Sequence, residues 1–273
     1  MTVDLDAALG TVADTSPLVN AFTNTVTVND VAQVILHWGG LPVMSEDERE
    51  VADMVAAAGG CLLNMGTITE TDEATMMAAG EAANEQGVPV VLDPVGVGAT
   101  PTRDRVADRF ASELDVAVIN GNYGEITALA GEDAEVRGVE SVGEYSDIAT
   151  TAVACAQTYD TVVVASGETD VVATAESVTE VAAGDPQMGT VVGTGCMLGA
   201  TVATFAAAIE DERQAALAGT VAFGLAGEAA ADGEFGDVHG PASFHVAFKD
   251  AVAGLGGTDT DAASDRIEQV LSV

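Results

Sequence analysis

Short runs of apolar residues alternate along the chain with longer segments in which apolar and polar residues are mixed. A short apolar run bounded by turn residues is typical of a buried parallel strand, and the mixed segments are typical of amphipathic helices that connect such strands. The pattern therefore predicts an α/β fold with a mostly parallel central sheet flanked by helices. The predicted parallel strands are Leu18–Phe22, Leu41–Met44, Cys61–Asn64, Val88–Asp93, Val116–Ile119 and Thr161–Ala165.

Local signals predict helices between and after these strands. Ser45-Glu46-Asp47-Glu48 has the spacing of a capping box, which predicts a helix from there through Ala58. The Ala-, Glu- and Met-rich segment Asp72–Gln86 is expected to be helical and to stop at Gly87. Later in the chain, Val171–Ala173 and Ser177–Val181 alternate as a short antiparallel pair. The remaining predicted helices form a helical C-terminal part and cover Thr194–Ile209, Arg213–Ala231, Pro241–Ala253 and Asp261–Leu271.

Length and composition favour one domain with an acidic surface. The chain has 273 residues, 48% of them hydrophobic, and no linker rich in Pro, Ser or charge divides it, so a single domain over residues 1–273 is expected. Its 44 acidic and 8 basic residues give a net charge of -36, which repels nucleic acid and anionic membrane surfaces. Because the carboxylates are scattered rather than gathered in a tail, they indicate a halophilic protein from a high-salt cytoplasm.

The cysteines and the longest uncharged run exclude other classes. Cys61, Cys155 and Cys196 are odd in number and lack C-x-x-C spacing, which argues against a disulfide framework or a zinc site and fits a reducing cytoplasm. Residues 1–6 lack the basic and apolar regions of a signal peptide. The run 191–209 contains Gly and Thr and has no flanking Lys or Arg, which favours a buried helix over a membrane span.

The segment Val191–Ala200 has the features of an anion-binding loop. Gly193 and Gly195 permit backbone angles closed to other residues and let backbone N–H groups approach a ligand. A helix that begins at Thr194 or Gly195 points its free N–H groups and positive dipole end at the same place. Cys196 then lies in the first turn, where a thiolate is favoured over a thiol. Phosphoryl or acyl transfer is one interpretation; an ordinary α/β turn with a packing cysteine is the other.

Two carboxylates follow neighbouring strands at the edge of the sheet where this loop is expected. Asp93 ends one strand and is followed by Pro and Gly, and Glu125 comes shortly after the next strand. Two carboxylates beside a phosphate site are typical of Mg²⁺ held partly through water, although either residue alone is as well explained as a turn or helix-capping acid. Ser166, after the last parallel strand, offers a hydroxyl to a nucleotide phosphate or forms an ordinary Ser-Gly turn.

Several motifs in order make the chain resemble a known family. The ordered set is Asn20-Ala21-Phe22-Thr23-Asn24, Pro42-Val43-Met44, Leu63-Asn64-Met65-Gly66-Thr67, Val91-Leu92-Asp93-Pro94-Val95-Gly96, Gly121-Asn122, Gly124-Glu125-Ile126, Ser166-Gly167-Glu168 and Gly193-Thr194-Gly195-Cys196. This set resembles the hydroxyethylthiazole kinase family, of the ribokinase-like fold, from about Leu18 to Ala208. Motifs that recur in consistent order and spacing are far more specific than any one of them.

The resemblance implies ATP-dependent phosphorylation of the hydroxyl of 4-methyl-5-(2-hydroxyethyl)thiazole, a salvage step toward thiamine, with Mg²⁺. It implies that Cys196 is the catalytic residue and that Asp93 and Glu125 organise the metal. It also implies a homotrimer with the thiazole site between subunits, an arrangement in which Asn24 and Cys196 can meet only across an interface. The remaining implied contacts are Met44, Asn24, Gly193 and Thr67 for the thiazole, and Asn120, Ser166, Gly193, Thr194 and Gly195 for ATP.

Two positions depart from the family's usual pattern. Asn120 stands where an Arg is usual, which removes a cation and its forked donors from the triphosphate site, and Ser166 stands where Thr is usual, which keeps the hydroxyl. An alternative is a ribokinase-like enzyme that acts on another small alcohol or on a hydrated nicotinamide nucleotide, which Met44 and Cys196 disfavour. A third is a non-catalytic nucleotide-binding regulatory protein, which the loss of the cation at Asn120 favours.

Overall fold

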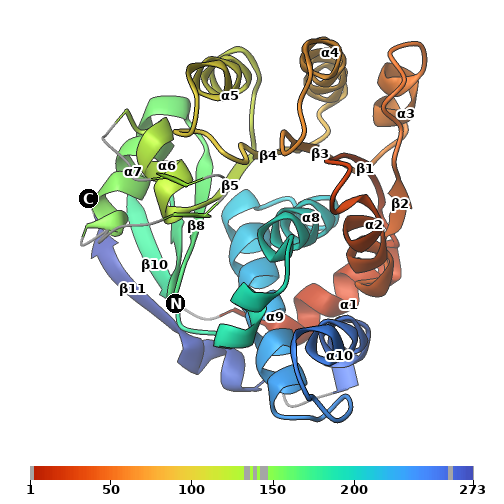
Figure 1. The fold of residues 1–273 in the computed structure, drawn as a ribbon, viewed down its shortest axis with the longest axis vertical. Helices are drawn as coiled ribbons and strands as arrows, with labels where there is room; N and C mark the ends of the chain where they lie inside the picture. The colour runs from red at the N-terminus through yellow and green to blue at the C-terminus, as the bar shows by residue number, and fades with distance from the viewer. Residues whose placement is uncertain (1–2, 132–135, 138–139, 142–146, 258–260, 273) are drawn as a thin grey trace.

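The computed structural model describes residues 3–131, 136–137, 140–141, 147–257 and 261–272, and in these residues one sheet runs through the centre of the molecule (Figure 1). The strand order is β11-β10-β9-β8-β5-β4-β3-β1-β2. Neighbours from β2 to β8 pair in parallel. This half comprises β2 (Leu41–Val43), β1 (Leu18–Phe22), β3 (Gly60–Asn64), β4 (Val90–Asp93), β5 (Val118–Asn122) and β8 (Val162–Ser166). The predicted α/β fold with a mostly parallel sheet is confirmed.

Helices cover both faces of the sheet because each parallel connection crosses over one of them. Two apolar clusters, one on each face, form the core between the layers. One face carries α3 (Val51–Ala56), α4 (Glu70–Gln86), α5 (Pro101–Glu113), α6 (Tyr123–Leu129) and α7 (Ile148–Tyr159). The other carries α1 (Leu5–Thr15), α2 (Val28–His37), α8 (Thr194–Ala206), α9 (Glu212–Ala231) and α10 (Pro241–Gly254). The short elements are β6 (Val136–Arg137), β7 (Glu140–Ser141), η1 (Pro186–Thr190), η2 (Leu255–Gly257) and η3 (Asp261–Arg266).

The end of the chain corrects the predicted helical C-terminal part. Strands β9 (Asp170–Ala173) and β10 (Ser177–Val181) form the predicted antiparallel pair. The predicted helix Asp261–Leu271 is wrong, because its first half is the 3₁₀ segment η3 and its second half belongs to β11 (Ile267–Ser272), which pairs antiparallel with β10. Without β11, the backbone N–H and C=O groups on the outer side of β10 would have no strand partner, and this tertiary pairing outweighs the local helical pattern.

The predicted capping box at Ser45 is also wrong. Helix α3 begins only at Val51. Ser45 is buried, with its backbone N–H on Asn20 Oδ1 and its hydroxyl on Glu50 Oε1, so it joins β1 to the turn before the helix. Reciprocal capping boxes occur instead at Thr69 with Asp72, before α4, and at Asn122 with Glu125, before α6.

Helix α8 is the most enclosed helix near the strand ends. It begins at Thr194 as predicted but ends at Ala206 rather than Ile209, and every residue from Cys196 onward is buried. Trp38 at the end of α2 packs edge-on against Phe205 and donates its Nε1–H to Thr201 Oγ1 at 2.9 Å. In the described part of the chain no helix has the length and apolar character needed to cross a membrane.

Two glycines of α9 give a matched test of this packing. A Cβ on Gly224 would lie 2.7 Å from the backbone carbonyl of Ala183, whereas the nearest atom to a Cβ on Gly219 would be 3.5 Å away. We expect Gly224→Ala to lower the free energy of unfolding by about 1–3 kcal/mol, since backbone must move. Gly219→Ala should raise it by about 0.5–1 kcal/mol, because Gly is a poor helix former. Urea unfolding in concentrated KCl measures both, and a Gly224→Ala variant as stable as Gly219→Ala would contradict the packing.

Candidate active site

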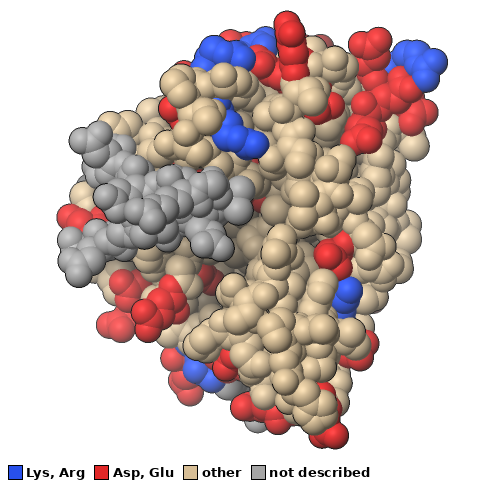
Figure 2. Space-filling view, viewed as in Figure 1, with Lys and Arg blue, Asp and Glu red and all other residues tan. Residues whose placement is uncertain are grey.

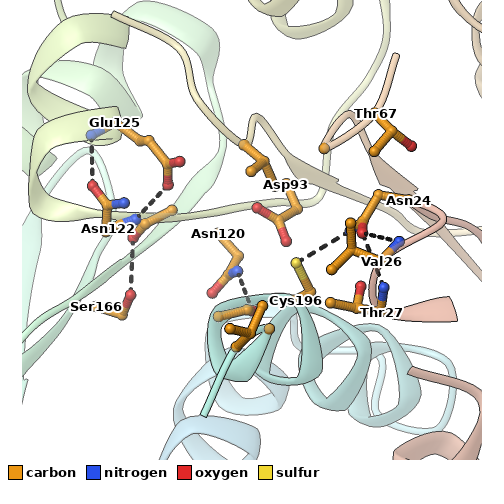
Figure 3. A pocket seen from close by; sticks show the side chains of 16 residues that line it. Asn24, Val26, Thr27, Thr67, Asp93, Asn120, Asn122, Glu125, Ser166 and Cys196 are labelled. Carbon is orange, nitrogen blue, oxygen red and sulfur yellow. Dashed lines mark hydrogen bonds between the residues drawn. The ribbon is translucent and has the colours of Figure 1, made fainter. Parts of the chain in front are cut away.

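A pocket opens where the carboxyl ends of β1, β3, β4, β5 and β8 meet the N-terminus of α8 (Figure 3). Its volume is about 210 Å³, and residues from the end of each of these strands, or from the loop after it, line it. Figure 2 shows that this face of the molecule is hollowed near its centre, with acidic side chains mainly toward its edges. An open parallel sheet offers its ligand site at this edge, because the strand-end loops converge there.

The N-terminus of α8 supplies the predicted anion-binding geometry. Gly193 is the N-cap, with φ at 89°, and no side chain caps the helix, so the first backbone N–H groups are left for a ligand. A Cβ on Gly193 would lie 2.3 Å from Thr27 Cγ2, so only glycine fits there. The Thr194 hydroxyl lies 2.8 Å from both Met188 O and Val191 O, which share its single proton, so the backbone N–H is the donor that Thr194 has left for a ligand.

Side-chain amides connect Cys196 to Asp93 beneath the pocket, and Figure 3 shows the first of them, Asn24, beside the sulfur. Asn24 Oδ1 accepts from the backbone N–H groups of Val26 and Thr27, so Asn24 Nδ2 faces Asn64 Oδ1 at 2.9 Å and Cys196 Sγ at 3.4 Å. Asn64 Nδ2 in turn donates to Asp93 Oδ2 at 2.5 Å. A backbone N–H donates to the Oδ1 atom of each amide, that of Gly66 in the case of Asn64. These bonds fix which end of each amide is the oxygen and which is the nitrogen. Cys196, Asn24, Asn64 and Asp93 therefore form one connected group.

This group corrects two expectations about Cys196. The contact with Asn24 forms within one chain, so the two residues do not need a subunit interface to meet. Burial, followed by the charge of Asp93, raises the pKa of the Cys196 thiol to about 12, against the smaller opposing effect of hydrogen bonds with Asn64, Thr27 and Asn24. The expected thiolate is therefore wrong: at neutral pH Cys196 is a thiol, because desolvation outweighs the helix dipole.

The two carboxylates predicted to organise Mg²⁺ both lie at the pocket. Asp93 is buried, and burial together with the charge of Glu125 holds its pKa well above the usual range. Glu125 accepts from Gly96 N–H at 2.7 Å and from Asn122 N–H at 2.9 Å, the latter as part of the α6 capping box. Burial nonetheless raises the pKa of Glu125 to about 7. Glu125 is thus both the helix-capping acid and a titratable group at the pocket.

Arg103 holds the loops around these carboxylates in place. Its guanidinium donates to Met65 O at 2.9 Å, to Gly66 O at 2.8 Å and to Val95 O. These contacts join the loop after β3 to the loop after β4. The same charge lowers the pKa of Glu125 slightly against the effect of burial.

Asn120 lines this pocket, and Ser166 lines both this pocket and a second cavity. Asn120 is buried, and its Nδ2 donates to Gly195 O at 3.3 Å, while its Oδ1 has no partner among the described residues. The Ser166 hydroxyl donates to Gly121 O at 3.4 Å. Ser166 and Gly195 also line the second cavity, of about 650 Å³, together with Thr194. The two cavities therefore meet at the N-terminus of α8.

Of the two remaining residues predicted to contact the thiazole, one lines the pocket and the other does not. Thr67 lines the pocket and accepts from Thr25 N–H at 3.1 Å. Met44 does not line it; it lies partly buried at the end of β2, packed against the core on the α8 side. Sequence reasoning missed Asn64, although it ends a strand at the same sheet edge as Asp93. It also missed Thr27, whose buried side chain lines the pocket and hydrogen-bonds toward Cys196.

Comparison with known proteins decides the family. The chain matches the sequence model of the hydroxyethylthiazole kinase family over residues 9–257. It belongs to the hydroxyethylthiazole kinase family. A hydroxyethylthiazole kinase of Natronomonas pharaonis is 65% identical over 273 residues, which cover 99% of this chain and 97% of that relative.

Solved structures agree with this family assignment. The hydroxyethylthiazole kinase protein of Pyrococcus horikoshii OT3 is 32% identical, with a TM-score of 0.84 over 97% of this chain and 98% of that chain. A ribokinase-like superfamily protein of Enterococcus faecalis V583 is 12% identical, with a TM-score of 0.63 over 90% and 88% of the two chains, and so shares the fold. The ribokinase-like fold expected for this member of the hydroxyethylthiazole kinase family is confirmed.

Two glycines of the anion-binding loop, Gly193 and Gly195, test its geometry. Gly193→Ala places a methyl group against Thr27 in a left-handed backbone, whereas a Cβ on Gly195 meets no atom within 4 Å. We expect Gly193→Ala to lower the free energy of unfolding by about 1–3 kcal/mol and Gly195→Ala to leave it nearly unchanged. Adding Thr27→Ser to Gly193→Ala removes the clashing methyl and should recover part of the loss. Equal unfolding curves for the two single variants would contradict this loop conformation.

Proposed function

We propose that this chain transfers the γ-phosphoryl group of ATP to the hydroxyl of 4-methyl-5-(2-hydroxyethyl)thiazole, in thiamine salvage. The family membership supports a kinase that acts on this alcohol. The observation that carries the proposal is the meeting of two cavities at the uncapped N-terminus of α8, one beside Cys196 and one beyond Ser166. A phosphoryl donor in one cavity and an alcohol acceptor in the other would meet at the backbone N–H groups of this helix end, where charge develops in phosphoryl transfer.

The second cavity suits the nucleoside of ATP. Ala183, Met188 and Phe223 give it apolar surface for a base, and Ser166 and Gly195 stand where it opens toward the smaller pocket. In this proposal the backbone N–H groups of Gly193, Thr194 and Gly195 bind the phosphates. Asn120 and the hydroxyl of Ser166 complete the phosphate end.

The smaller pocket suits the thiazole alcohol. Asn24, Thr67 and Gly193 line it, and exposed Val26 and Val192 stand at its rim. We include the homotrimer in the proposal, because exposed apolar side chains at the rim and on α2 favour cover by a neighbouring subunit. Met44 follows β2, the edge strand of the sheet. In such a trimer it would contact a thiazole bound between its own subunit and a neighbour. The free, buried cysteines support a cytoplasmic location.

The residues at the pocket fit Mg²⁺ held largely by water and phosphate. Asp93 Oδ1 has no hydrogen-bond donor among the described residues, while both oxygens of Glu125 already accept backbone N–H groups. No three His, Cys, Asp or Glu side chains of the described chain gather as a metal cage. Asp93 would therefore hold the ion directly or through water, with Glu125 behind it, as Mg²⁺ prefers in nucleotide sites. The bound ion would neutralise charge on the transferring phosphoryl group.

The protein's own groups would supply position and charge stabilisation. The helix N–H groups would face the phosphoryl group, and Cys196, which Asn24 holds in place, would lie beside the acceptor hydroxyl. A loose phosphoryl-transfer transition state needs little early deprotonation of the alcohol, so a neutral thiol suffices as a positioning group. Asp93, which Asn64 and Asn24 connect to Cys196, is the carboxylate of this network that would accept the proton that the alcohol loses.

An assay in concentrated KCl tests the activity. The purified protein with ATP and Mg²⁺ should release ADP only when hydroxyethylthiazole is present, with phosphorylated thiazole as the product by mass spectrometry. Release with another small alcohol or a hydrated nicotinamide nucleotide, but not with the thiazole, would favour the second interpretation. Nucleotide binding without turnover would favour the regulatory one.

Variants of Cys196 distinguish a positioning thiol from a base. We expect Cys196→Ala to lower kcat about tenfold, well short of the roughly 10²–10⁴-fold loss typical of a missing general base. Cys196→Asp should retain or raise kcat, with a rate that increases with pH, because burial and Asp93 raise the pKa of an acid placed there. Cys155→Ala, a buried cysteine in α7, is the control. An unchanged kcat in Cys196→Ala would remove the residue from the mechanism.

A further inference from the structure

One wall of the larger cavity is a short segment, residues 182–188, which leads from β10 toward α8. The lining residues that belong to this wall segment are Ala183, Gly184, Asp185, Pro186 and Met188. Gly184 has φ at 128°, a left-handed backbone that favours glycine, so the chain turns sharply where it leaves the sheet. In the proposed function this cavity takes the nucleoside of ATP. The position of the wall segment therefore sets the shape of the nucleotide site.

The wall segment rests on one face of α9. Gly224, Gly227 and Glu228 have the i, i+3, i+4 spacing that places residues on the same side of a helix. A Cβ on Gly224 would lie 2.7 Å from the backbone carbonyl of Ala183. A Cβ on Gly227 would collide with the thioether of Met188. The two glycines therefore let the wall segment lie directly against the helix, with Glu228 beside them as the polar member of this face.

Glu228 connects the wall segment to the C-terminal part of the chain. Its Oε1 accepts the backbone N–H of Gly184 at 3.1 Å, and its Oε2 accepts from Arg266 Nη2 at 2.6 Å. Arg266, at the end of η3, also contacts the wall segment itself. Its carbonyl oxygen accepts from Ala182 N–H at 2.8 Å, and its Nη1 lies 3.5 Å from Ala182 O. The short contact with Glu228 is therefore the main link that the Arg266 side chain makes.

Solvent reaches this ion pair only in part. The Glu228 side chain is 23% exposed and that of Arg266 is 39% exposed. Because salt screens partly buried charges less than exposed ones, the pair stays effective in concentrated salt. Arg266 is one of 8 basic residues in a chain with 44 acidic ones. Without it, the Glu228 carboxylate would keep only the Gly184 N–H as a partner among the described residues.

We propose that Arg266 and Glu228 are positioning residues for the nucleotide, because they hold the wall segment where it lines the larger cavity. Neither residue lines either of the two cavities, so their effect reaches ATP through residues 182–188. This inference rests on the proposed function, because it needs the nucleotide in the larger cavity. The C-terminal segment then influences the affinity for ATP and leaves the affinity for the thiazole alcohol unchanged.

Steady-state kinetics in concentrated KCl test the positioning role. We expect Arg266→Ala to raise the KM for ATP and the Kd of Mg·ADP about three- to tenfold, as the loss of a partly shielded ion pair would. The KM for hydroxyethylthiazole and the kcat at saturating ATP should stay near wild-type, because the pair contacts neither Cys196 nor the N-terminus of α8. Arg266→Lys should recover part of the loss. A merely less stable protein would instead lower the apparent kcat and leave both KM values unchanged.

Arg109→Ala is the matched control. Arg109 pairs with Glu73 at 2.9 Å, its side chain is 37% exposed, and it lies on α5 and lines neither cavity. This variant should change neither KM. A Glu228→Ala chain adds the second step. If Arg266 acts through Glu228, removal of Arg266 from that chain should weaken Mg·ADP binding less than its removal from the wild type.

Equal Kd values for Mg·ADP in the wild type and Arg266→Ala would overturn the inference. Equal changes in both KM values, or an undiminished further loss in the double variant, would also overturn it. Fluorescence of Trp38, the one tryptophan, checks that each variant is folded.

Hydrogen exchange of the wild type gives a readout that needs no variant. Mg·ADP should slow amide exchange in the wall segment and in residues 263–272, to which Arg266 ties it. Exchange that Mg·ADP leaves unchanged in either segment overturns the inference. A wild-type protein that binds no Mg·ADP would instead overturn the proposed function, and this inference with it.

Discussion

The enclosure of α8 beneath the parallel strand ends is the constraint on which the site depends. From Cys196 onward every residue of the helix is buried. The N-terminal turn is therefore the part of the helix that is open to a ligand, and it faces the strand-end loops. Gly199 lets Asp93 and Asn120 pack directly against the helix, because any side chain there would push both away. The same packing removes solvent from the Cys196 sulfur and from the carboxylates of Asp93 and Glu125, and this desolvation raises the pKa of all three groups.

Desolvation of this strength changes what the site's groups can do. A helix N-terminus favours a thiolate by a modest amount, but burial and a neighbouring carboxylate act in the opposite direction and are stronger here. The network of Asn24, Asn64 and Asp93 then has a positioning role, because the backbone N–H groups that hold the two amide oxygens keep the Asn24 Nδ2 group against the Cys196 sulfur. Precise placement with a neutral thiol is consistent with a reaction that needs alignment more than a strong base.

Sequence reasoning predicted the parallel strands because each is a short apolar run, and β1 was predicted to the residue. It also brought Asn24, Asp93 and Glu125 to one sheet edge, since parallel strands all end there, and it placed Cys196 in the first turn of α8. It failed where a distant partner decides the outcome. Ser45 has the sequence of a helix cap, but its backbone N–H donates to Asn20 of β1. Residues 267–272 have a helical pattern, but they pair with β10. The orientation of Asn64 and the missing partner of Asn120 Oδ1 depend on segments far apart in the chain.

The contact between Asn24 and Cys196 within one chain has a genetic consequence for any assembly of this protein. Two defective alleles, one without Asn24 and one without Cys196, would each encode subunits that lack one half of the pair. Mixed oligomers would contain both halves, but never in the same subunit. Intragenic complementation should therefore fail for this pair of positions, whereas it remains available to a pair whose members belong to different subunits.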